Sequence, residues 1–598
     1  MSLFTRSPRG PETPADDGAA PGEGAAADGK DGGRAQGAGD GEHRGTAGWL
    51  RRHRVVPRTV TVLAFLLVAF ALLTPNRLSE ITPGAFARVP IEGVLGVVVV
   101  LALRGRARRI AAGCGGAALG ALLVVKIVDM GFYQVLVRPW DPVLDWAFLE
   151  AGLEFVTGEH GGASAVALAA GAAALAVGVI VVMALAAMRL AGVAARHDVL
   201  AARAVVVLWA VWSVGAVFGA QLVPGVPVAS SNTAKLAYSR ALKVRRGLHD
   251  KEVFARQAAV DDFRATPGDK LLTGLRGKDV VIAFVESYGR DAVEDPQFSA
   301  QVGAVLDAGG ERLRKAGFHA RSGWLTSSTM GGGSWLAHAT LLSGLWIDNQ
   351  QRYQNLVATD RLTLNRAFGR AGWRTVGLMP AITRAWPEGR FFGYDQIYDY
   401  RTLGYRGPRW AYATMPDQYT LSFFQRVERE REGRTTPVMA EIELVSSHAP
   451  WAAIPRLVDW KQVGDGSIFH AQGGVSLKAA KWPPNDKIRG EYRKSIEYTL
   501  STLISYVETY GDDDLVLVFL GDHQPAPTIT GEDASRDVPV TIVARDREVL
   551  DRISDWGWQD GLKPGRRSPV WRMSDFRDRF LTAFGSQPVR AQSQANPR

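Results

Sequence analysis

The hydrophobic positions divide the chain into two parts. Before residue 225, apolar residues gather in long runs near 58–75, 84–103, 110–129, 162–188 and 204–223. Each run is close to the roughly 20 residues that a helix needs to cross a bilayer. Farther along, the apolar runs are short and alternate with amphipathic stretches. The pattern therefore predicts five transmembrane helices over 49–224, followed by a globular domain over 271–585.

The ends of the chain and the segment between its two parts differ in composition. Residues 1–48 are rich in Gly, Ala, Asp, Glu and Pro and have almost no aliphatic side chains. Such a segment cannot bury a core, so we expect a disordered tail there, and a second, short tail over 586–598. The basic segment 225–270 predicts a juxtamembrane linker helix, with or without contact between its cations and anionic headgroups.

The arginines near the apolar runs indicate how the membrane region is oriented. Clusters precede the first run, separate the second from the third, and separate the fourth from the fifth, whereas the alternate loops hold few. The clustered residues are Arg51, Arg52, Arg54, Arg58, Arg104, Arg106, Arg108, Arg109, Arg189, Arg196 and Arg203. Because positively charged loops stay in the cytoplasm, the N-terminus is predicted to be cytoplasmic. Five crossings then place the globular domain outside the cell.

Charge and cysteine content narrow the classes of partner. The formal net charge is +10 in a chain of 598 residues. We assign this excess to cytoplasmic loops and solvated surface. No Lys/Arg stripe with interleaved aromatic residues is present, so we expect no nucleic-acid partner. Cys114 is the single cysteine, and the outer domain must therefore be held together by its core, without intramolecular disulfides.

The globular part alternates between two kinds of segment. Short, continuous apolar runs, typical of buried parallel strands, lie at 279–286, 373–379, 438–444, 515–520 and 538–544. Helical stretches lie between them, at 298–316, 334–343, 360–371, 417–431 and 487–510. This alternation predicts an α/β domain with a mostly parallel sheet and helices on both faces.

Polar residues follow three of the predicted strands. Glu286 ends the first strand, His448 follows the strand 438–444, and Asp522 and His523 follow the strand 515–520. Ligands of parallel sheets bind beyond the carboxyl ends of the strands, so these residues are expected to meet at one edge. An oxygen and nitrogen ligand pair suits Mn²⁺ or Zn²⁺. The alternatives are a surface carboxylate for Glu286, a buried structural histidine for His448 and a strand-capping turn for Asp522 and His523.

A glycine-rich segment supplies a candidate nucleophile. Gly331-Gly332-Gly333 precedes Ser334 and a predicted apolar helix. The glycines allow close approach of the backbone, and the helix start offers free N–H groups to an anion. A hydroxyl there can be metal-bound and aimed at phosphorus. The alternative for Ser334 is an N-cap, and the close rivals for the nucleophile are Ser327, Ser328 and Thr329.

These pieces together resemble the alkaline phosphatase/sulfatase superfamily. The resemblance is carried by Glu286, by Ser334 ahead of Leu341-Leu342-Ser343-Gly344, by His448 in Ser-His-Ala-Pro-Trp, and by Gly521-Asp522-His523. Five spans before such a domain resemble the lipoteichoic acid synthase and phosphoglycerol transferase branch, as do segments 362–376 and 392–395. The resemblance covers roughly 50–545.

The resemblance implies a membrane enzyme that moves a phospho-headgroup, phosphoglycerol-like, from a phospholipid to an envelope glycan, lipid or polymer. A phospho-Ser or phospho-Thr intermediate would form on the way. One divalent cation, Mn²⁺ ahead of Mg²⁺ or Zn²⁺, would be held by Glu286, Ser334, Asp522 and His523. The alternative is a phosphodiesterase, phosphatase or sulfatase-like hydrolase of the same superfamily. A catalytically inactive scaffold is a third interpretation, and the intact ligand set argues against it.

The resemblance also implies roles in substrate binding, where the chain departs from the family. His448 would hold the substrate phosphate or protonate the leaving oxygen. The further candidates for substrate contact are Arg384, Arg390, Trp386, His338 and Trp451. The synthases use Thr as nucleophile, and after the strand that ends at Met379 they have a His and an acid. This chain has Pro380, Ala381 and Ile382 there, so the headgroup is not fixed by the resemblance.

Overall fold

The computed structural model describes residues 43–586, apart from 147, 150, 151, 154, 155, 158–160, 477 and 478. The tails expected over 1–48 and 586–598 lie outside the described residues, except for 43–48, which are helical, and Ser586. The chain divides into two compact units, residues 1–60 and 61–598. The described part of the first unit is the beginning of helix α1 (His43–Leu73), and the second unit holds the other described elements.

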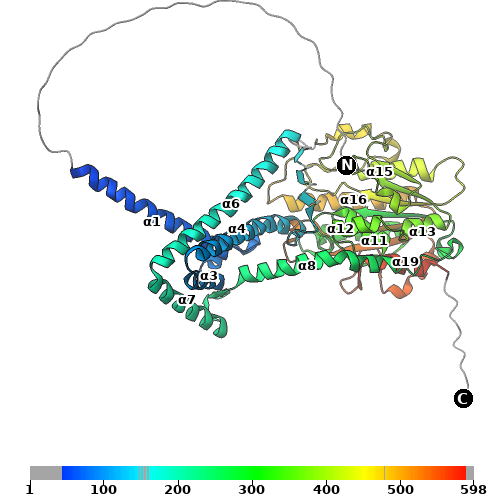
Figure 1. The fold of residues 1–598 in the computed structure, drawn as a ribbon. Coiled ribbons are helices and arrows are strands. Elements are labelled where there is room, and N and C mark those ends of the chain that lie inside the picture. Colours follow the sequence, from blue (N-terminus) through cyan, green and yellow to red (C-terminus); the bar gives the residue numbers. More distant parts are fainter. Residues whose placement is uncertain are drawn as a thin grey trace, which may run out of the picture. The chain divides into compact units, whose positions relative to one another are not determined.

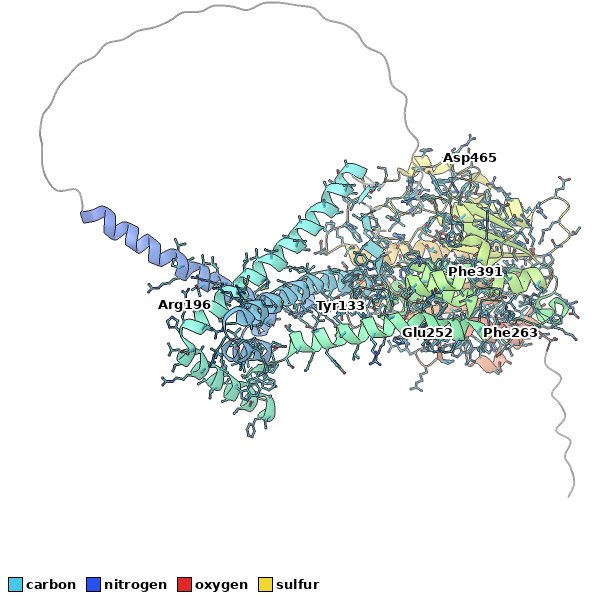
Figure 2. All side chains as sticks on the ribbon, in the orientation of Figure 1. Tyr133, Arg196, Glu252, Phe263, Phe391 and Asp465 are labelled. Atoms are coloured by element: carbon cyan, nitrogen blue, oxygen red, sulfur yellow. The ribbon has the colours of Figure 1, made fainter. Side chains whose placement is uncertain are left out.

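Residues 43–218 are mostly helical (Figure 1). Within the described residues, four helical segments are long and apolar enough to cross a membrane: Val56–Leu73 of α1, α4 (Gly105–Leu136), α6 (Gly162–Arg196) and α7 (Asp198–Phe218). The most apolar windows of α6 and α7 are only 6% buried, so these surfaces need an apolar surrounding such as lipid. Arg196, labelled in Figure 2, is the last residue of α6.

The second expected span, 84–103, differs from the prediction. Its helical part is α3 (Ile91–Ala102), which has 12 residues. A helix of that length rises about 18 Å, less than the roughly 30 Å of the hydrocarbon core. One proline begins the single-turn helix α2 (Pro83–Phe86), and another ends the short strand β1 (Val89–Pro90), directly before α3. Proline is favoured at a helix start and disfavoured in a helix interior, and here two prolines divide a run that hydropathy alone treats as one helix.

Helix α8 (Asn232–Ala259) follows the apolar helices. In its first half, Arg240 forms a buried ion pair with Asp129 of α4. In its second half, Asp250 accepts hydrogen bonds of 2.6 and 2.8 Å from Arg352 of the C-terminal domain. Ion pairs therefore join α8 both to α4 and to the C-terminal domain. Short strands precede α8: β2 (Gln221–Val223) pairs with β3 (Val226–Pro227), and β4 (Ala229–Ser230) pairs with β1.

The C-terminal domain is built on a nine-stranded sheet in the order β12-β6-β11-β10-β5-β9-β7-β8, with β13 beside β6. The strands are β5 (Asp279–Val285), β6 (His319–Thr326), β7 (Arg374–Met379), β8 (Gln396–Asp399), β9 (Val438–Leu444), β10 (Leu515–Gly521), β11 (Asp537–Ala544), β12 (Gln559–Asp560) and β13 (Val570–Arg572). From β10 to β8 all neighbours are parallel, whereas β11 and β12 run antiparallel to theirs. The expected α/β domain with a mostly parallel sheet is confirmed.

Helices cover both faces of this sheet (Figure 1). Along β5, the odd-numbered residues from Val281 to Val285 pack into one core and the even-numbered residues from Val280 to Phe284 into the other. Helices of the first core are α10 (Ser299–Lys315), α15 (Asp417–Phe424) and α16 (Ile488–Tyr510). Helices of the second core are α11 (Ser334–Ser343), α13 (Leu364–Arg370) and α19 (Phe576–Phe584). Shorter helices are α9 (Arg290–Glu294), α12 (Gln350–Val357), α14 (Gly389–Phe392), α17 (Pro527–Thr530) and α18 (Arg547–Asp551).

Candidate active site

The carboxyl ends of three neighbouring strands meet at one edge of the sheet. Strands β10, β5 and β9 are adjacent and parallel, and their last residues are in register. The polar residues that follow these strands are Glu286, Ser447, His448, Asp522 and His523. Residues far apart in the sequence are thereby brought to one place.

Glu286, Asp522 and His523 form a buried cluster whose ligand atoms all lie within 4.8 Å of one another. His523 Nε2 lies 3.5 Å from Glu286 Oε1 and 3.4 Å from Asp522 Oδ2. His523 Nδ1 lies 2.9 Å from the carbonyl oxygen of Gln524, so Nδ1 carries the proton and Nε2 keeps its lone pair. Two carboxylates and an imidazole lone pair suit Mn²⁺ or Zn²⁺. The donor set therefore fits a divalent cation.

The charges of the cluster also favour a cation. Burial raises the pKa of Asp522, and the nearby Glu286 carboxylate raises it further. Burial alone would raise the pKa of Glu286, but His523 and His448 hold it below its ordinary value. Burial opposes protonation of His523, yet the two carboxylates raise its pKa above the ordinary value. Two carboxylates this close repel each other in a buried site, and a divalent cation would neutralise both.

Ser334 joins this cluster through its hydroxyl. Its Oγ donates to Glu286 Oε2 at 3.0 Å and lies 3.2 Å from His523 Nε2. The three preceding glycines, 331–333, have φ angles of 73°, 153° and 83°, which glycine adopts without steric cost. Gly333, and not Ser334, occupies the N-cap position of α11. The Ser334 side chain therefore points to the cluster instead of capping the helix.

The three rival hydroxyls bond elsewhere. Ser327 and Thr329 donate to backbone carbonyls, and Ser328 accepts a hydrogen bond from a threonine of α11. None of these three described residues lines the cavity that contains Ser334. The geometry favours Ser334 as the nucleophile.

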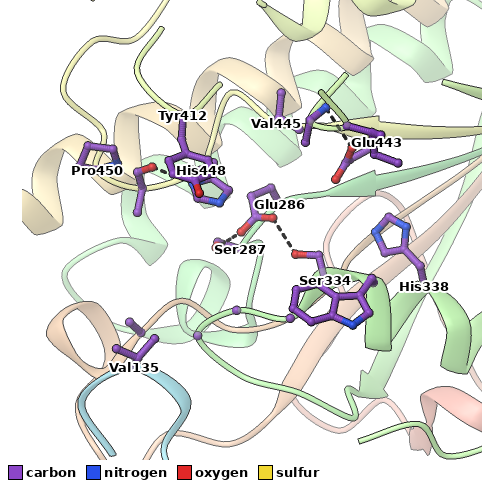
Figure 3. Close-up of a pocket in the computed structure, with 18 of the residues that line it drawn as sticks. Val135, Glu286, Ser287, Ser334, His338, Tyr412, Glu443, Val445, His448 and Pro450 are labelled. Carbon is purple, nitrogen blue, oxygen red and sulfur yellow. Dashed lines mark hydrogen bonds between the residues drawn. The ribbon is translucent and has the colours of Figure 1, made fainter. Parts of the chain in front are cut away.

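A cavity of about 1340 Å³ opens over the cluster (Figure 3). Its aromatic lining residues are Trp335, Tyr353, Trp386, Phe392, Tyr394, Tyr412, Trp451 and Trp482. Gln134 and Val135, at the C-terminal end of the apolar helix α4, also line it. A cavity of this size accommodates a small-molecule ligand.

His448 lies beside the cluster. Its ring stacks on Tyr412, with centroids 4.5 Å apart and planes 7° apart. Its Nδ1 lies 2.7 Å from the Ala449 carbonyl oxygen, which leaves Nε2 for a ligand. Figure 3 shows the ring close to Glu286, and both residues line the cavity. The Trp451 indole N–H donates to the Ser447 carbonyl at 2.7 Å and so fixes the turn that carries His448.

The candidate substrate-binding residues fall into two groups. Trp386, His338 and Trp451 line the cavity. Arg384 and Arg390 are exposed and are not among the described residues that line it. Arg390 instead lines a separate hollow of about 450 Å³. Both arginines follow β7 on a segment whose Trp386 lines the cavity, while their own side chains are exposed.

Two carboxylates in the cavity wall were not anticipated as site residues. Glu441 and Glu443 belong to β9 and line the cavity. The signal was present in the sequence, because acidic residues at alternate positions of an otherwise apolar strand put two charges on one face of the sheet. In the structure, Tyr394 donates a hydrogen bond to Glu441.

No protein-family model matches the chain, and no curated protein matches it in sequence. Among solved structures, the lipoteichoic acid synthase LtaP of Listeria monocytogenes is 15% identical, with a TM-score of 0.37, covering 53% of this chain and 74% of that chain. An alkaline phosphatase superfamily protein of Vibrio parahaemolyticus is 14% identical, with a TM-score of 0.35, covering 56% and 74%. The phosphoglycerol transferase GacH of Streptococcus pyogenes, in complex with sn-glycerol-1-phosphate, is 12% identical, with a TM-score of 0.34, covering 56% and 81%.

All three TM-scores are below 0.5, so the functional argument rests on the residues of the site. Each of the three structures is similar to a little over half of this chain.

Proposed function

We propose that this protein is a membrane-anchored, metal-dependent transferase that moves a phospho-headgroup from a lipid to a cell-envelope acceptor. The observation that carries the proposal is the position of Ser334. Its hydroxyl lies at a helix start, within hydrogen-bond distance of both Glu286 and His523, at the floor of a large cavity. A hydroxyl held among metal-ligand side chains and open to a cavity is arranged for attack on phosphorus.

The chain's own residues supply three functions in this scheme. Glu286, Asp522 and His523, with Ser334, would hold the cation, which when bound lowers the pKa of the hydroxyl and offsets phosphate charge. The helix start presents N–H groups to the phosphate. Ser334 loses its hydroxyl proton to solvent in the cavity, and its Oγ forms a bond to phosphorus while the bond to the diacylglycerol oxygen breaks; His448 Nε2 is placed to protonate that oxygen. An acceptor hydroxyl then gives its proton to His448 and forms a bond to phosphorus while the bond to Ser334 Oγ breaks, and Ser334 is protonated again from solvent.

The lining of the cavity supports a lipid substrate. Gln134 and Val135 come from the end of α4, one of the four helices apolar enough to cross a membrane. A headgroup at the bilayer surface would therefore meet a cavity whose wall includes the end of a membrane helix. The aromatic residues around it offer the amphipathic surface that interfacial sites use.

We further propose that the chain crosses the membrane five times and that the C-terminal domain is extracellular. The arginine clusters at 51–58 and 104–109 must both face the cytoplasm under the positive-inside rule. This requires two crossings between them, so the segment around α3 must cross despite its short helix. A reporter that is active only outside the cell, fused after residue 224, is expected to be active. Activity of a cytoplasm-only reporter at that position would contradict the topology.

Transfer is tested with the full-length protein in vesicles that contain a lipid labelled in its headgroup phosphate. The expected result is release of unlabelled diacylglycerol and appearance of the label in an envelope glycan, lipid or polymer. Label that appears only as a free soluble phosphate or phosphate ester would instead assign a hydrolase. No diacylglycerol release with any divalent cation would contradict both activities.

His448→Ala is expected to lower diacylglycerol release about 10²–10⁴-fold, the usual contribution of a general acid. Metal content should stay normal, because no hydrogen bond joins His448 to the cluster residues in the described structure. The matched control is His470→Ala, since this histidine is exposed and bonds to the Arg406 carbonyl outside the cavity. Loss of bound metal in the His448 variant would make it a ligand, and unchanged turnover would remove it from the mechanism.

A further inference from the structure

Three ionisable side chains lie together in the cavity wall next to Ser334. Glu441 and Glu443 are two positions apart on β9 and so lie on one face of the sheet. His338 lies one helical turn after Ser334 on α11. All line the cavity, and Figure 3 shows Glu443 and His338 near Ser334. None of the three belongs to the proposed metal ligands.

Glu441 is already engaged by three donors. His338 Nδ1 lies 3.1 Å from Oε1, and Oε2 accepts hydrogen bonds from Tyr394 and, at 3.2 Å, from Asn365. Both oxygens of Glu441 are therefore occupied as acceptors. Burial lowers the pKa of His338, but the hydrogen bond and charge of Glu441 raise it above the ordinary value. The contact with Glu441 thus favours the imidazolium form of His338.

The other ring nitrogen of His338 has no partner. Its Nε2 is buried and makes no hydrogen bond within the described part of the chain, and the residue is 8% exposed. In an imidazolium this nitrogen is a donor, and leaving it unpaired costs about 1–3 kcal/mol. An oxygen of a phosphate held at Ser334 would satisfy it.

Glu443, by contrast, is an acceptor with few donors. Only the backbone N–H of Ala381 donates to it among the described residues, over 3.4 Å. Burial raises the pKa of Glu443 to about 7, while His338 lowers it and Glu286 adds to the rise. Two carboxyl groups, Glu441 and Glu443, face one imidazole, so acidic side chains outnumber basic ones in this wall. A divalent cation at the neighbouring cluster would be matched by Glu286 and Asp522, whereas an ammonium group beside Glu443 would favour its ionised form.

A second metal ion fits this wall less well than an ammonium group. Across the described residues, the three-ligand groups with atoms within 4.8 Å of one another include only the cluster of Glu286, Asp522 and His523. Lys481 and Glu388 also line the cavity, Lys481 as an exposed side chain, and their charges offset each other. An ammonium needs no such tight ligand set, because one carboxylate and aromatic faces suffice to bind it.

We propose that Glu443 binds a primary ammonium group of the ligand while His338 Nε2 donates to an oxygen of its phosphate. The cavity would then select an ammonium-bearing ligand over one that ends in a neutral polyol. The proposal rests on the proposed function in placing the phosphate at Ser334. The ammonium belongs either to the headgroup of the donor lipid or to the acceptor.

The first test measures binding, which does not depend on turnover. Full-length Ser334→Ala protein in detergent, with saturating Mn²⁺, is titrated with 2-aminoethyl phosphate and with glycerol phosphate, and then with an amino sugar and its N-acetylated form. The ammonium-bearing member of at least one pair is expected to bind about 10- to 100-fold more tightly, as for a hydrogen bond to a charged group. Glu443→Gln should remove that difference, whereas the matched control Glu388→Gln should keep it.

The second test assigns the source of the ammonium. Vesicles of a phospholipid with an aminoethyl headgroup and of one with a glycerol headgroup are compared by diacylglycerol release. A preference for the first that is lost in Glu443→Gln places the ammonium on the donor lipid. Equal release from both, with a raised KM of Glu443→Gln for an amino-bearing acceptor alone, places it on the acceptor.

Two results would overturn the inference. One is that Glu443→Gln leaves both ligand pairs bound as in the parent protein. The other is that the parent protein binds two Mn²⁺ ions and Glu443→Gln binds one, because Glu443 would then be a metal ligand. Absence of diacylglycerol release from every lipid, together with an ammonium preference in binding, would contradict the proposed transferase and support this subsite.

Discussion

Ser334→Ala is expected to abolish diacylglycerol release, by on the order of 10⁴-fold or more, because no other described hydroxyl shares the position of its Oγ. The fold should be retained. Ser334 stands after the N-cap Gly333, so its loss removes no capping bond. The measurements are diacylglycerol release, circular dichroism and bound metal in the purified full-length protein.

The control for this substitution is Thr329→Ala, the rival whose hydroxyl donates to the Gly332 carbonyl. This variant should keep most of its activity. Brief incubation of the wild-type protein with headgroup-labelled lipid, followed by acid quench and peptide mapping, should place the label on Ser334. A labelled peptide that contains Thr329 and lacks Ser334 would transfer the nucleophile role to Thr329.

Asp522→Ala is expected to remove the bound divalent cation and with it the turnover. The carboxylate supplies one of the two negative charges of the cluster, and without it Glu286 is the one charged ligand left in that cluster. Metal analysis of the full-length protein after dialysis gives the direct readout. Wild-type protein should also gain about 2.7 kcal/mol of stability at a cation concentration 100 times the Kd, and the variant should gain nothing.

A second variant separates metal loss from misfolding. Asp522 Oδ1 accepts hydrogen bonds from the backbone N–H groups of Ser287 and His523, at 2.8 and 2.6 Å, and alanine leaves both unpaired. Asp522→Asn keeps an oxygen acceptor there while removing the charge, so it should fold and still lose metal. The exposed Asp533→Ala is the matched control. Full metal occupancy in both Asp522 variants would show that Asp522 is not a metal ligand.

The parts of the fold that could be predicted from the sequence are those buried on both sides. Strands β5 and β10 are apolar throughout because each face of the sheet is covered by helices, and this gives the continuous runs that the prediction used. The hydrophobic pattern does not predict strand β6 (His319–Thr326), because only three of its eight residues have apolar side chains. Its burial comes from pairing with β11, β12 and β13, which no local pattern reveals.

The position of a site residue can be predicted where the residue ends a strand. It cannot be predicted where it depends on the path of a loop. Glu286, Asp522 and His523 follow strands whose ends are in register, so their meeting follows from the topology. Arg384 and Arg390 were proposed from the order of motifs, and the loop after β7 leaves both exposed. The carboxylates of β9 were overlooked because the strand was treated as an apolar segment alone.

The pairing of β5 with β10 has a consequence for folding during synthesis. Ser287 and Asp522, which bond to each other beyond the strand ends, are separated by 235 positions. At a synthesis rate of about 5–20 residues per second, β5 emerges roughly 10–50 s before its partner. During that interval a strand that is apolar on both faces has an unpaired edge, a template for aggregation that chaperones must cover. The catalytic centre is thus completed late in synthesis, and a chain that stops before residue 515 lacks β10 and leaves that edge of β5 permanently open.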